Sequence, residues 1–137
     1  MNKEQIKFHY GVAFEERLLS GFLYYYRSEN VVEYDLKSFT KGDLKGEITP
    51  DAAIAKSVDE LASLDSVDPI LDKYDGGWDD AGGSIIWFEF RNCQKKVVVV
   101  EIYDRALLKT NEEMVLFRVI DAFNMLTNRI YDLEKNA

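Results

Sequence analysis

Apolar and polar residues alternate along several stretches of the chain, and the spacing of this pattern is the first guide to the fold. Over residues 31–39, the apolar Val32, Tyr34 and Leu36 are separated by charged residues. A period of two places such apolar side chains on one face of a strand. We therefore predict a half-buried strand over 31–39, followed by a loop or an irregular hairpin over 40–47.

Residues 84–103 contain two alternating runs in succession, which predicts a β-hairpin. The apolar side chains that share a face are Ile86, Phe88 and Phe90 in the first run and Val98, Val100 and Ile102 in the second. Pairing Phe90 with Val98 keeps both sets on one face and leaves a three-residue loop over 93–95. A slip to Phe90–Val97 would bring Glu101 into the core, where an unpaired carboxylate is costly. We predict the first register.

The N-terminal residues fit two patterns. Residues 6–12 alternate as in a strand, whereas a stripe at steps of three and four is typical of a helix; the members of the stripe are Ile6, Tyr10, Phe14, Leu18, Phe22 and Tyr25. Charged residues opposite the stripe favour the helix after Ala13. We predict a helix over about 13–28 and leave residues 3–12 as either strand or helix. Gly21 would cost about 1 kcal/mol relative to alanine inside that helix, which indicates a close contact there.

Two further helices carry recognisable start signals. Thr49 can cap a helix whose first position is Pro50, and an apolar stripe follows, so we predict a helix over about 50–64. Thr110 and Glu113 match a capping box, which predicts a long helix over about 111–135. The first half of this long helix is apolar around most of its circumference. It is therefore either a central helix or part of a surface for self-association.

These elements predict an α+β fold in which all 137 residues form a single domain. We expect an antiparallel sheet of three or more strands, including the hairpin at about 84–103, packed against the helices at about 13–28, 50–64 and 111–135.

Charge and composition narrow the possible functions. The net charge of −8 disfavours nucleic acid and anionic membranes as direct partners, because both would be repelled. No stretch approaches the length of a membrane span, and the polar N-terminus lacks the pattern of a secretory signal. The single Cys93 cannot form an internal disulfide, which fits a reducing compartment, so we expect a cytoplasmic protein.

The acidic charge is concentrated in one stretch. Residues 59–80 contain eight acids and one lysine, a net charge of −7, and four of the eight glycines lie among residues 76–83. The latter part of this stretch combines carboxylates with two aromatic residues. Clustered carboxylates steer a basic partner, and aromatic side chains anchor interfaces. We predict a partner-binding site formed by Asp72, Tyr74, Asp75, Trp78, Asp79 and Asp80.

This site predicts a non-catalytic, protein-binding module without a cofactor. Its concrete form would be an immunity or inhibitor protein that neutralises a basic, nucleic-acid-acting enzyme or toxin, as in a bacterial toxin–antitoxin pair. No catalytic motif supports an enzyme, since one histidine and one cysteine cannot supply a Cys/His zinc cluster and the glycine pairs do not match a phosphate-binding loop.

Two alternatives use the same features differently. Asp72, Asp75, Asp79 and Asp80 could bind Ca²⁺ or Mg²⁺, in a metal-binding domain or a metal-dependent enzyme, although their spacing is not that of an EF-hand loop. The apolar half of the C-terminal helix could instead mediate a homodimer, which would make the chain a structural subunit.

Overall fold

Among the described residues, one sheet and two helices contain nearly all of the regular structure. The computed structural model describes residues 4–11, 20–38, 41–74, 83–90, 93–100 and 105–134. The strands are β1 Gln5–Gly11, β2 Ser20–Tyr26, β3 Val31–Ser38, β4 Gly42–Ile48, β5 Lys73–Tyr74, β6 Gly83–Phe90 and β7 Cys93–Val100. The helices are α1 Ala52–Ala62 and α2 Asn111–Glu134, with a single 3-10 turn at Arg105–Leu107. This arrangement confirms the α+β class.

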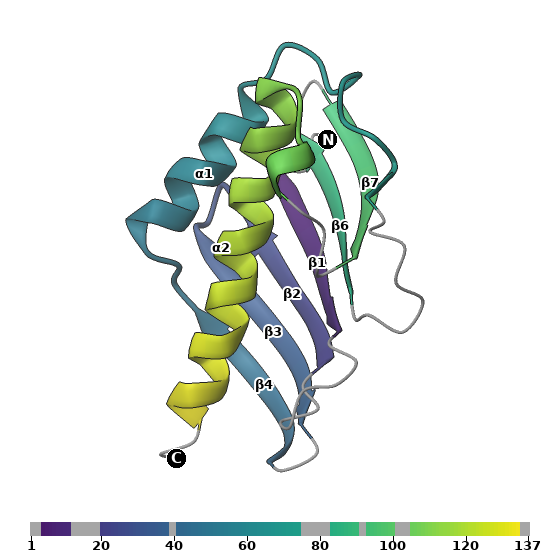
Figure 1. The fold of residues 1–137 in the computed structure, drawn as a ribbon. Helices are drawn as coiled ribbons and strands as arrows, with labels where there is room; N and C mark the ends of the chain where they lie inside the picture. Colours follow the sequence, from purple (N-terminus) through teal and green to yellow (C-terminus); the bar gives the residue numbers. More distant parts are fainter. Residues whose placement is uncertain are drawn as a thin grey trace.

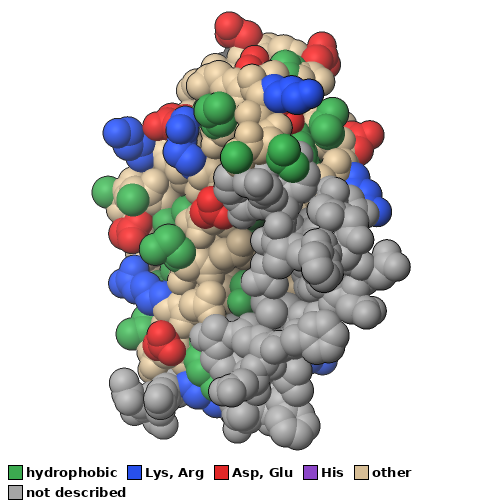
Figure 2. Space-filling view, viewed as in Figure 1, with side chains coloured by type: hydrophobic (Ala, Val, Ile, Leu, Met, Phe, Trp, Pro, Cys, Tyr) green, Lys and Arg blue, Asp and Glu red, His purple; other side chains and the backbone are tan. Residues whose placement is uncertain are grey.

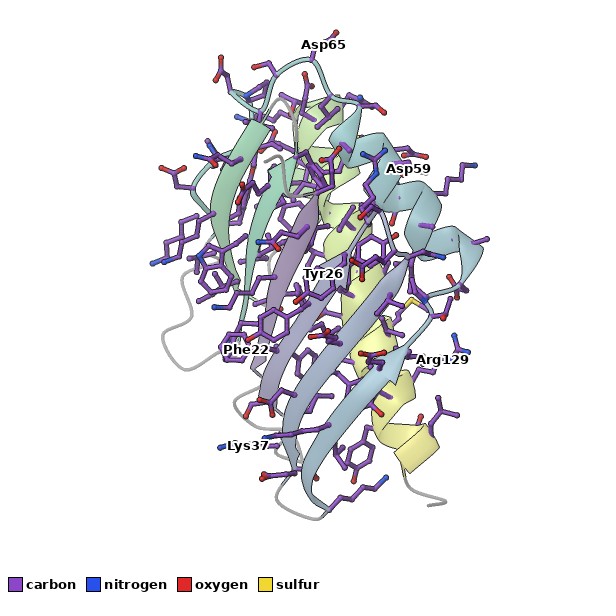
Figure 3. The ribbon with its side chains drawn as sticks, turned by 180° about the vertical axis from the view of Figure 1, so that it is seen from behind. Phe22, Tyr26, Lys37, Asp59, Asp65 and Arg129 are labelled. Carbon is purple, nitrogen blue, oxygen red and sulfur yellow. The ribbon has the colours of Figure 1, made fainter. Side chains whose placement is uncertain are left out.

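The sheet has seven strands in the order β4-β3-β2-β1-β6-β7-β5. Every pair of neighbours is antiparallel except β5 and β7, which are parallel. Both helices lie on the same side of the sheet, with α2 along its length and α1 beside α2 (Figure 1). The opposite face of the sheet carries no described helix (Figure 3). Along each strand, successive side chains therefore point alternately to the face covered by the helices and to the face that carries no described helix.

The core lies between α2 and the helix-facing side of the sheet. Phe123 of α2 is fully buried, stacks on Phe8 of β1 at 5.6 Å between ring centroids, and meets Tyr25 of β2 edge-on at 6.1 Å. Beside α2, α1 contributes Ile54, Val58 and Leu61 to the same core. The sheet and α1 bury α2 on two sides, which explains why its first half is apolar around most of its circumference. Of the two alternatives for this helix, the structure therefore supports a central helix.

The predicted strand over 31–39 is confirmed as β3, and the segment that follows it forms β4, so the hairpin alternative holds there. The predicted helix over 50–64 is confirmed as α1. Its cap is Asp51, however, whose carboxylate accepts a hydrogen bond from the backbone N–H of Ile54 at 3.0 Å. The cap therefore lies two residues later than Thr49, the cap that we predicted, and both Thr49 and Pro50 precede it.

The capping box of the C-terminal helix is confirmed. The Glu113 N–H donates to Thr110 Oγ1 at 3.1 Å, and the Thr110 N–H donates to Glu113 Oε1 at 3.1 Å. The helix α2 that begins there agrees with the predicted range of 111–135 to within one residue.

The predicted N-terminal helix is wrong over residues 20–26, which form strand β2; residues 12–19 lie outside the described part of the chain. Residues 5–11 form β1, which decides the ambiguity between strand and helix. The aromatic run in β2 favours a strand, and the backbone φ of +140° at Gly21 is incompatible with a helix. The stripe at helical spacing arose because β1 carries apolar residues at alternate positions and β2 carries them at every position from 22 to 26.

The predicted hairpin is present, but its register is wrong. Phe90 is paired with Cys93, and Val97 and Val99 are the buried residues of β7. β7 ends in four consecutive valines, so either face of this strand offers apolar side chains to the core. Our choice of register depended on keeping Glu101 out of the core, and Glu101 lies outside the described residues.

Gly21 lies at a close contact, as we predicted, but it belongs to strand β2 and not to a helix. A Cβ atom at this position would overlap the backbone carbonyl oxygen of Asp35 and lie 2.7 Å from Leu36 Cα on the adjacent β3. We expect Gly21→Ala to lower the free energy of unfolding by about 3 kcal/mol or more, because backbone atoms must shift. Chemical denaturation followed by circular dichroism measures this loss.

Gly42→Ala is the matched control for that substitution. Gly42 also has a positive φ, +77°, but nothing lies within 4 Å of an added Cβ. Only the backbone strain remains, so we expect a loss of about 1 kcal/mol. Equal losses for the two variants would contradict the assignment of a steric contact at Gly21.

Candidate functional site

The first part of the acidic stretch is held by ion pairs. Asp59 on α1 accepts from Arg27 Nε at 3.0 Å, and the Arg27 guanidinium also donates to Glu4 at 3.1 Å. Glu60 pairs with Arg118 of α2 at 3.1 Å. These contacts connect α1 to the sheet and to α2, and their partial exposure makes each worth little stability. The acids on α1 are thus explained by contacts within the chain.

The acids that follow α1 face solvent at one end of the molecule. Asp65 projects from the segment after α1 (Figure 3), and Asp68 is also exposed. Within the described ranges, no basic side chain forms an ion pair with either carboxylate. The Asp68 N–H donates to Ser66 Oγ at 3.1 Å, which fixes the turn between them. These two carboxylates extend the acidic surface toward Asp72.

Asp72 lies on the surface beside the edge of the sheet, as a contact residue should. Its side chain is 89% exposed and accepts from Lys95 Nζ of β7 at 3.2 Å. The Asp72 backbone carbonyl accepts from the Val98 N–H at 2.9 Å, which attaches this segment to β7. Asp75, Trp78, Asp79 and Asp80, the other predicted contact residues apart from Tyr74, lie outside the described residues.

Tyr74 is a core residue, which corrects our expectation of a surface anchor. It is 1% exposed, and its ring meets Phe117 of α2 edge-on at a centroid distance of 4.9 Å. Its hydroxyl donates to Glu113 Oε2 at 2.7 Å and accepts from the Leu71 N–H at 2.9 Å. The side chain thus presents almost no surface to a partner. Its hydrogen bond to Glu113 attaches β5, the last described part of the acidic stretch, to the start of α2.

Glu113 is the buried carboxylate of this attachment, at 7% exposure. Burial alone would raise its pKa, but hydrogen bonds from the Tyr74 and Thr110 hydroxyls and from the backbone N–H groups of Lys109 and Thr110 outweigh burial and lower the pKa. The helix start favours the same negative charge. Glu113 therefore remains ionised at neutral pH and connects β5 to α2.

The open face of the sheet carries an aromatic and cationic cluster that our sequence reasoning missed. Lys7 of β1 stands opposite Tyr24 of β2 on one side and Trp87 of β6 on the other, and Lys96 of β7 stands opposite Trp87. Lys7 Nζ lies 4.9 Å from the Trp87 ring centroid and Lys96 Nζ lies 5.4 Å from it. These distances fit cation–π interactions.

The same face continues with further aromatic side chains on β2. Phe22 and Tyr26 lie on the side away from α2 (Figure 3), and the Phe22 ring centroid is 4.9 Å from Lys7 Nζ. His9 packs against Phe22 with 4.9 Å between ring centroids. Burial, and then the charge of Lys7, lowers the pKa of His9 from 6.5, so the imidazole is neutral at neutral pH. The sequence signal for this face was the aromatic run 22–26, which we had placed on a helix.

Most of the apolar surface of α2 is covered within the chain. The exposed apolar residues of this helix are Met114, Met125 and Leu133, and Met125 is 73% exposed. A hollow of about 210 Å³ beside Met125 lies between α1 and α2. On this side of the molecule, hydrophobic side chains occur in separate groups among charged ones (Figure 2).

Within the described ranges, no three His, Cys, Asp or Glu side chains are grouped in a way that could hold a metal ion. Of the four aspartates in the metal-binding alternative, the structure describes only Asp72. In the same part of the chain, neither helix is both long and apolar enough to cross a membrane. The chain matches no model of a protein family and no curated protein.

The attachment at Glu113 can be tested by substitution. We expect Glu113→Ala to lower the free energy of unfolding by about 3 kcal/mol, because the capping box is lost and the buried Tyr74 hydroxyl loses its acceptor. Glu112→Ala is the matched control; it removes the neighbouring carboxylate of the same helical turn, at a cost of about 0.5 kcal/mol. Urea unfolding of both variants measures the difference. Similar losses would show that the Tyr74–Glu113 contact contributes little.

The lowered pKa of Glu113 also predicts a dependence on pH. A carboxylate whose folded pKa lies below its unfolded value stabilises the fold above the unfolded pKa and loses this contribution as the pH falls through the folded pKa. We expect the wild type to lose more free energy of unfolding than Glu113→Gln between about pH 6 and pH 3. Parallel losses in urea unfolding at a series of pH values would contradict this.

Proposed function

We propose that this protein is a non-catalytic, partner-binding module that neutralises a basic protein through its acidic segment. The observation that carries the proposal is the placement of charge. Residues 59–80 hold a net charge of −7 in a chain of net charge −8. An acidic surface of this kind accelerates association with a basic partner and disfavours nucleic acid in the same place.

The contacts of the individual acids support a division within this segment. Asp59 and Glu60 are paired with arginines of the chain itself, whereas Asp65 and Asp68 form no ion pair with a described residue, and Asp72 remains 89% exposed although it pairs with Lys95. The partner would therefore meet the carboxylates that follow α1. Tyr74 is buried and presents almost no surface to a partner, so we propose Trp78 as the aromatic anchor.

An immunity or inhibitor protein for a basic, nucleic-acid-acting enzyme or toxin is the concrete form that we propose. Such an enzyme carries a cationic surface for its phosphate-rich substrate. A protein that presents clustered carboxylates around an aromatic anchor can occupy that surface and compete with the substrate. This mode of inhibition needs no catalytic group and no cofactor, and it predicts a cytoplasmic location together with the enzyme that must be neutralised.

Charge reversal in the segment tests this proposal. Tagged wild-type protein is used to capture its stoichiometric partner from the native cell at low salt, and the binding of the purified partner is then measured. We expect the triple variant Asp75→Lys, Asp79→Lys, Asp80→Lys to bind at least about tenfold more weakly, since each lost charge contact weakens binding and adds repulsion. Raising the salt concentration should weaken the wild type most.

The matched control reverses three exposed acids elsewhere: Asp43→Lys, Glu47→Lys and Asp132→Lys. The change in net charge is identical, so retained binding in this control assigns the effect to the acidic segment. Equal binding by wild type and the triple variant in the segment would exclude the proposal. A partner that is not basic, or one whose activity is unchanged by the complex, would exclude the inhibitor form of it.

A further inference from the structure

The edge of the sheet at β7 is only partly covered. β5 pairs with β7 at Val98 and Val99 alone. The Val98 N–H points away from β6, since it donates to the Asp72 carbonyl oxygen. Backbone direction alternates along an antiparallel strand, so the N–H groups of Gln94 and Lys96 point the same way. On the side of β7 away from β6, no strand of the described ranges pairs with Gln94 or Lys96, so this part of the edge can accept an added strand.

A cationic hollow adjoins this free edge on the open face. Its volume is about 500 Å³, and its lining includes Gln5, Lys7, Trp87, Glu89, Gln94 and Lys96. The ammonium groups of Lys7 and Lys96 both lie within 5.4 Å of the Trp87 ring centroid. In the described part of the chain, neither lysine forms an ion pair with a carboxylate. The hollow therefore holds two cations, over an aromatic ring, that can still bind an anion.

We propose that this site binds an extended peptide segment that carries an acidic side chain. The peptide backbone pairs with the free part of the β7 edge, in line with β5. A side chain opposite Lys96 then lies on the open face, and its carboxylate reaches the hollow above Trp87. The amides of Gln5 and Gln94 can both donate and accept hydrogen bonds, as a peptide ligand requires.

Charge selects this occupant over two others. A polyanion such as single-stranded nucleic acid would meet two lysines but also Glu89 in the hollow, and would be repelled by a chain of net charge −8. A second copy pairing through the same edge would bring its own lysines against Lys96, which is how edge lysines discourage self-pairing. A short acidic peptide carries far fewer charges than a polyanion, so Glu89 and the net charge of the chain repel it less, and it brings no lysine against Lys96.

This inference stands apart from the proposed neutralisation of a basic protein. The acidic segment and the β7 site differ in sign, in residues and in the chemistry of the ligand. Charge changes at Asp75, Asp79 and Asp80 test the first, and changes at Lys7 and Lys96 test the second, so the failure of either proposal is recognisable without the other.

Titration of the ¹⁵N-labelled protein with two capped peptides tests the site by nuclear magnetic resonance. The probe is Thr-Glu-Val-Glu-Val-Glu-Thr, and its control replaces each Glu by Gln. We expect the probe to shift the Trp87 indole N–H signal and to slow amide hydrogen exchange at Gln94 and Lys96. The control peptide should bind at least about tenfold more weakly, as expected for the loss of charge-assisted hydrogen bonds.

Variants assign the effect to the hollow. Lys7→Gln with Lys96→Gln should weaken binding of the acidic probe roughly tenfold. Lys45→Gln, an exposed lysine on β4, is the matched control and should leave binding unchanged. Equal binding of both peptides, or unchanged binding by the Lys7/Lys96 variant, would overturn the proposal.

Two competing occupants give their own signatures. Preferential binding of an oligouridylate at the same signals would assign the site to nucleic acid. Shifts at Gln94 and Lys96 that depend on protein concentration without peptide would assign the edge to a second copy. Either result would overturn the proposal, as would the absence of any shift at millimolar peptide.

Discussion

The packing of α2 along one face of the sheet is the constraint on which the rest of the structure depends. A seven-stranded sheet must bury at least one face to be stable, and the Phe123 contacts with Phe8 and Tyr25 show how α2 provides that burial. Because α1 packs beside α2, both helices lie on the same side of the sheet. The other face is left open, so it can meet a partner, as can the β7 edge and the end of the molecule that follows α1.

Glu113 connects that packing to the acidic segment. Its carboxylate caps α2 through Thr110 and accepts from Tyr74, which ends the short edge strand β5. One buried charge thus fixes both the start of the helix and the point at which the chain enters the segment 75–82. A buried carboxylate is stable only with several donors, and here two hydroxyls and two backbone N–H groups provide them. These hydrogen bonds fix the position of Tyr74, the last residue before the segment 75–82.

The sequence was most informative where a local chemical signal determined an element. The capping box at Thr110 and Glu113 and the period of two in β3 depend on neighbouring residues, and both predictions were confirmed. The predicted N-terminal helix failed because β2 carries aromatic residues on both of its faces, so that Phe22 and Tyr25 fall at helical spacing although they lie on opposite faces of the strand. Only pairing across the sheet, such as Phe8 with Leu23, decides between these patterns. The hairpin register failed for a similar reason, since four valines in a row offer apolar side chains to either face.

For the candidate sites too, features that depend on neighbouring residues could be predicted from the sequence, and contacts between distant residues could not. The acidic stretch could be recognised from composition, and the pairing of Asp59 and Glu60 with Arg27 and Arg118 could not, because each pair joins elements far apart in the chain. The Lys7–Trp87–Lys96 row joins three strands and exists only in the folded sheet. Its consequence is that a chain of net charge −8 has a cationic hollow on the open face of its sheet. Net charge therefore describes the long-range attraction or repulsion between the whole chain and a partner, whereas a row of opposed side chains sets the local charge of one face.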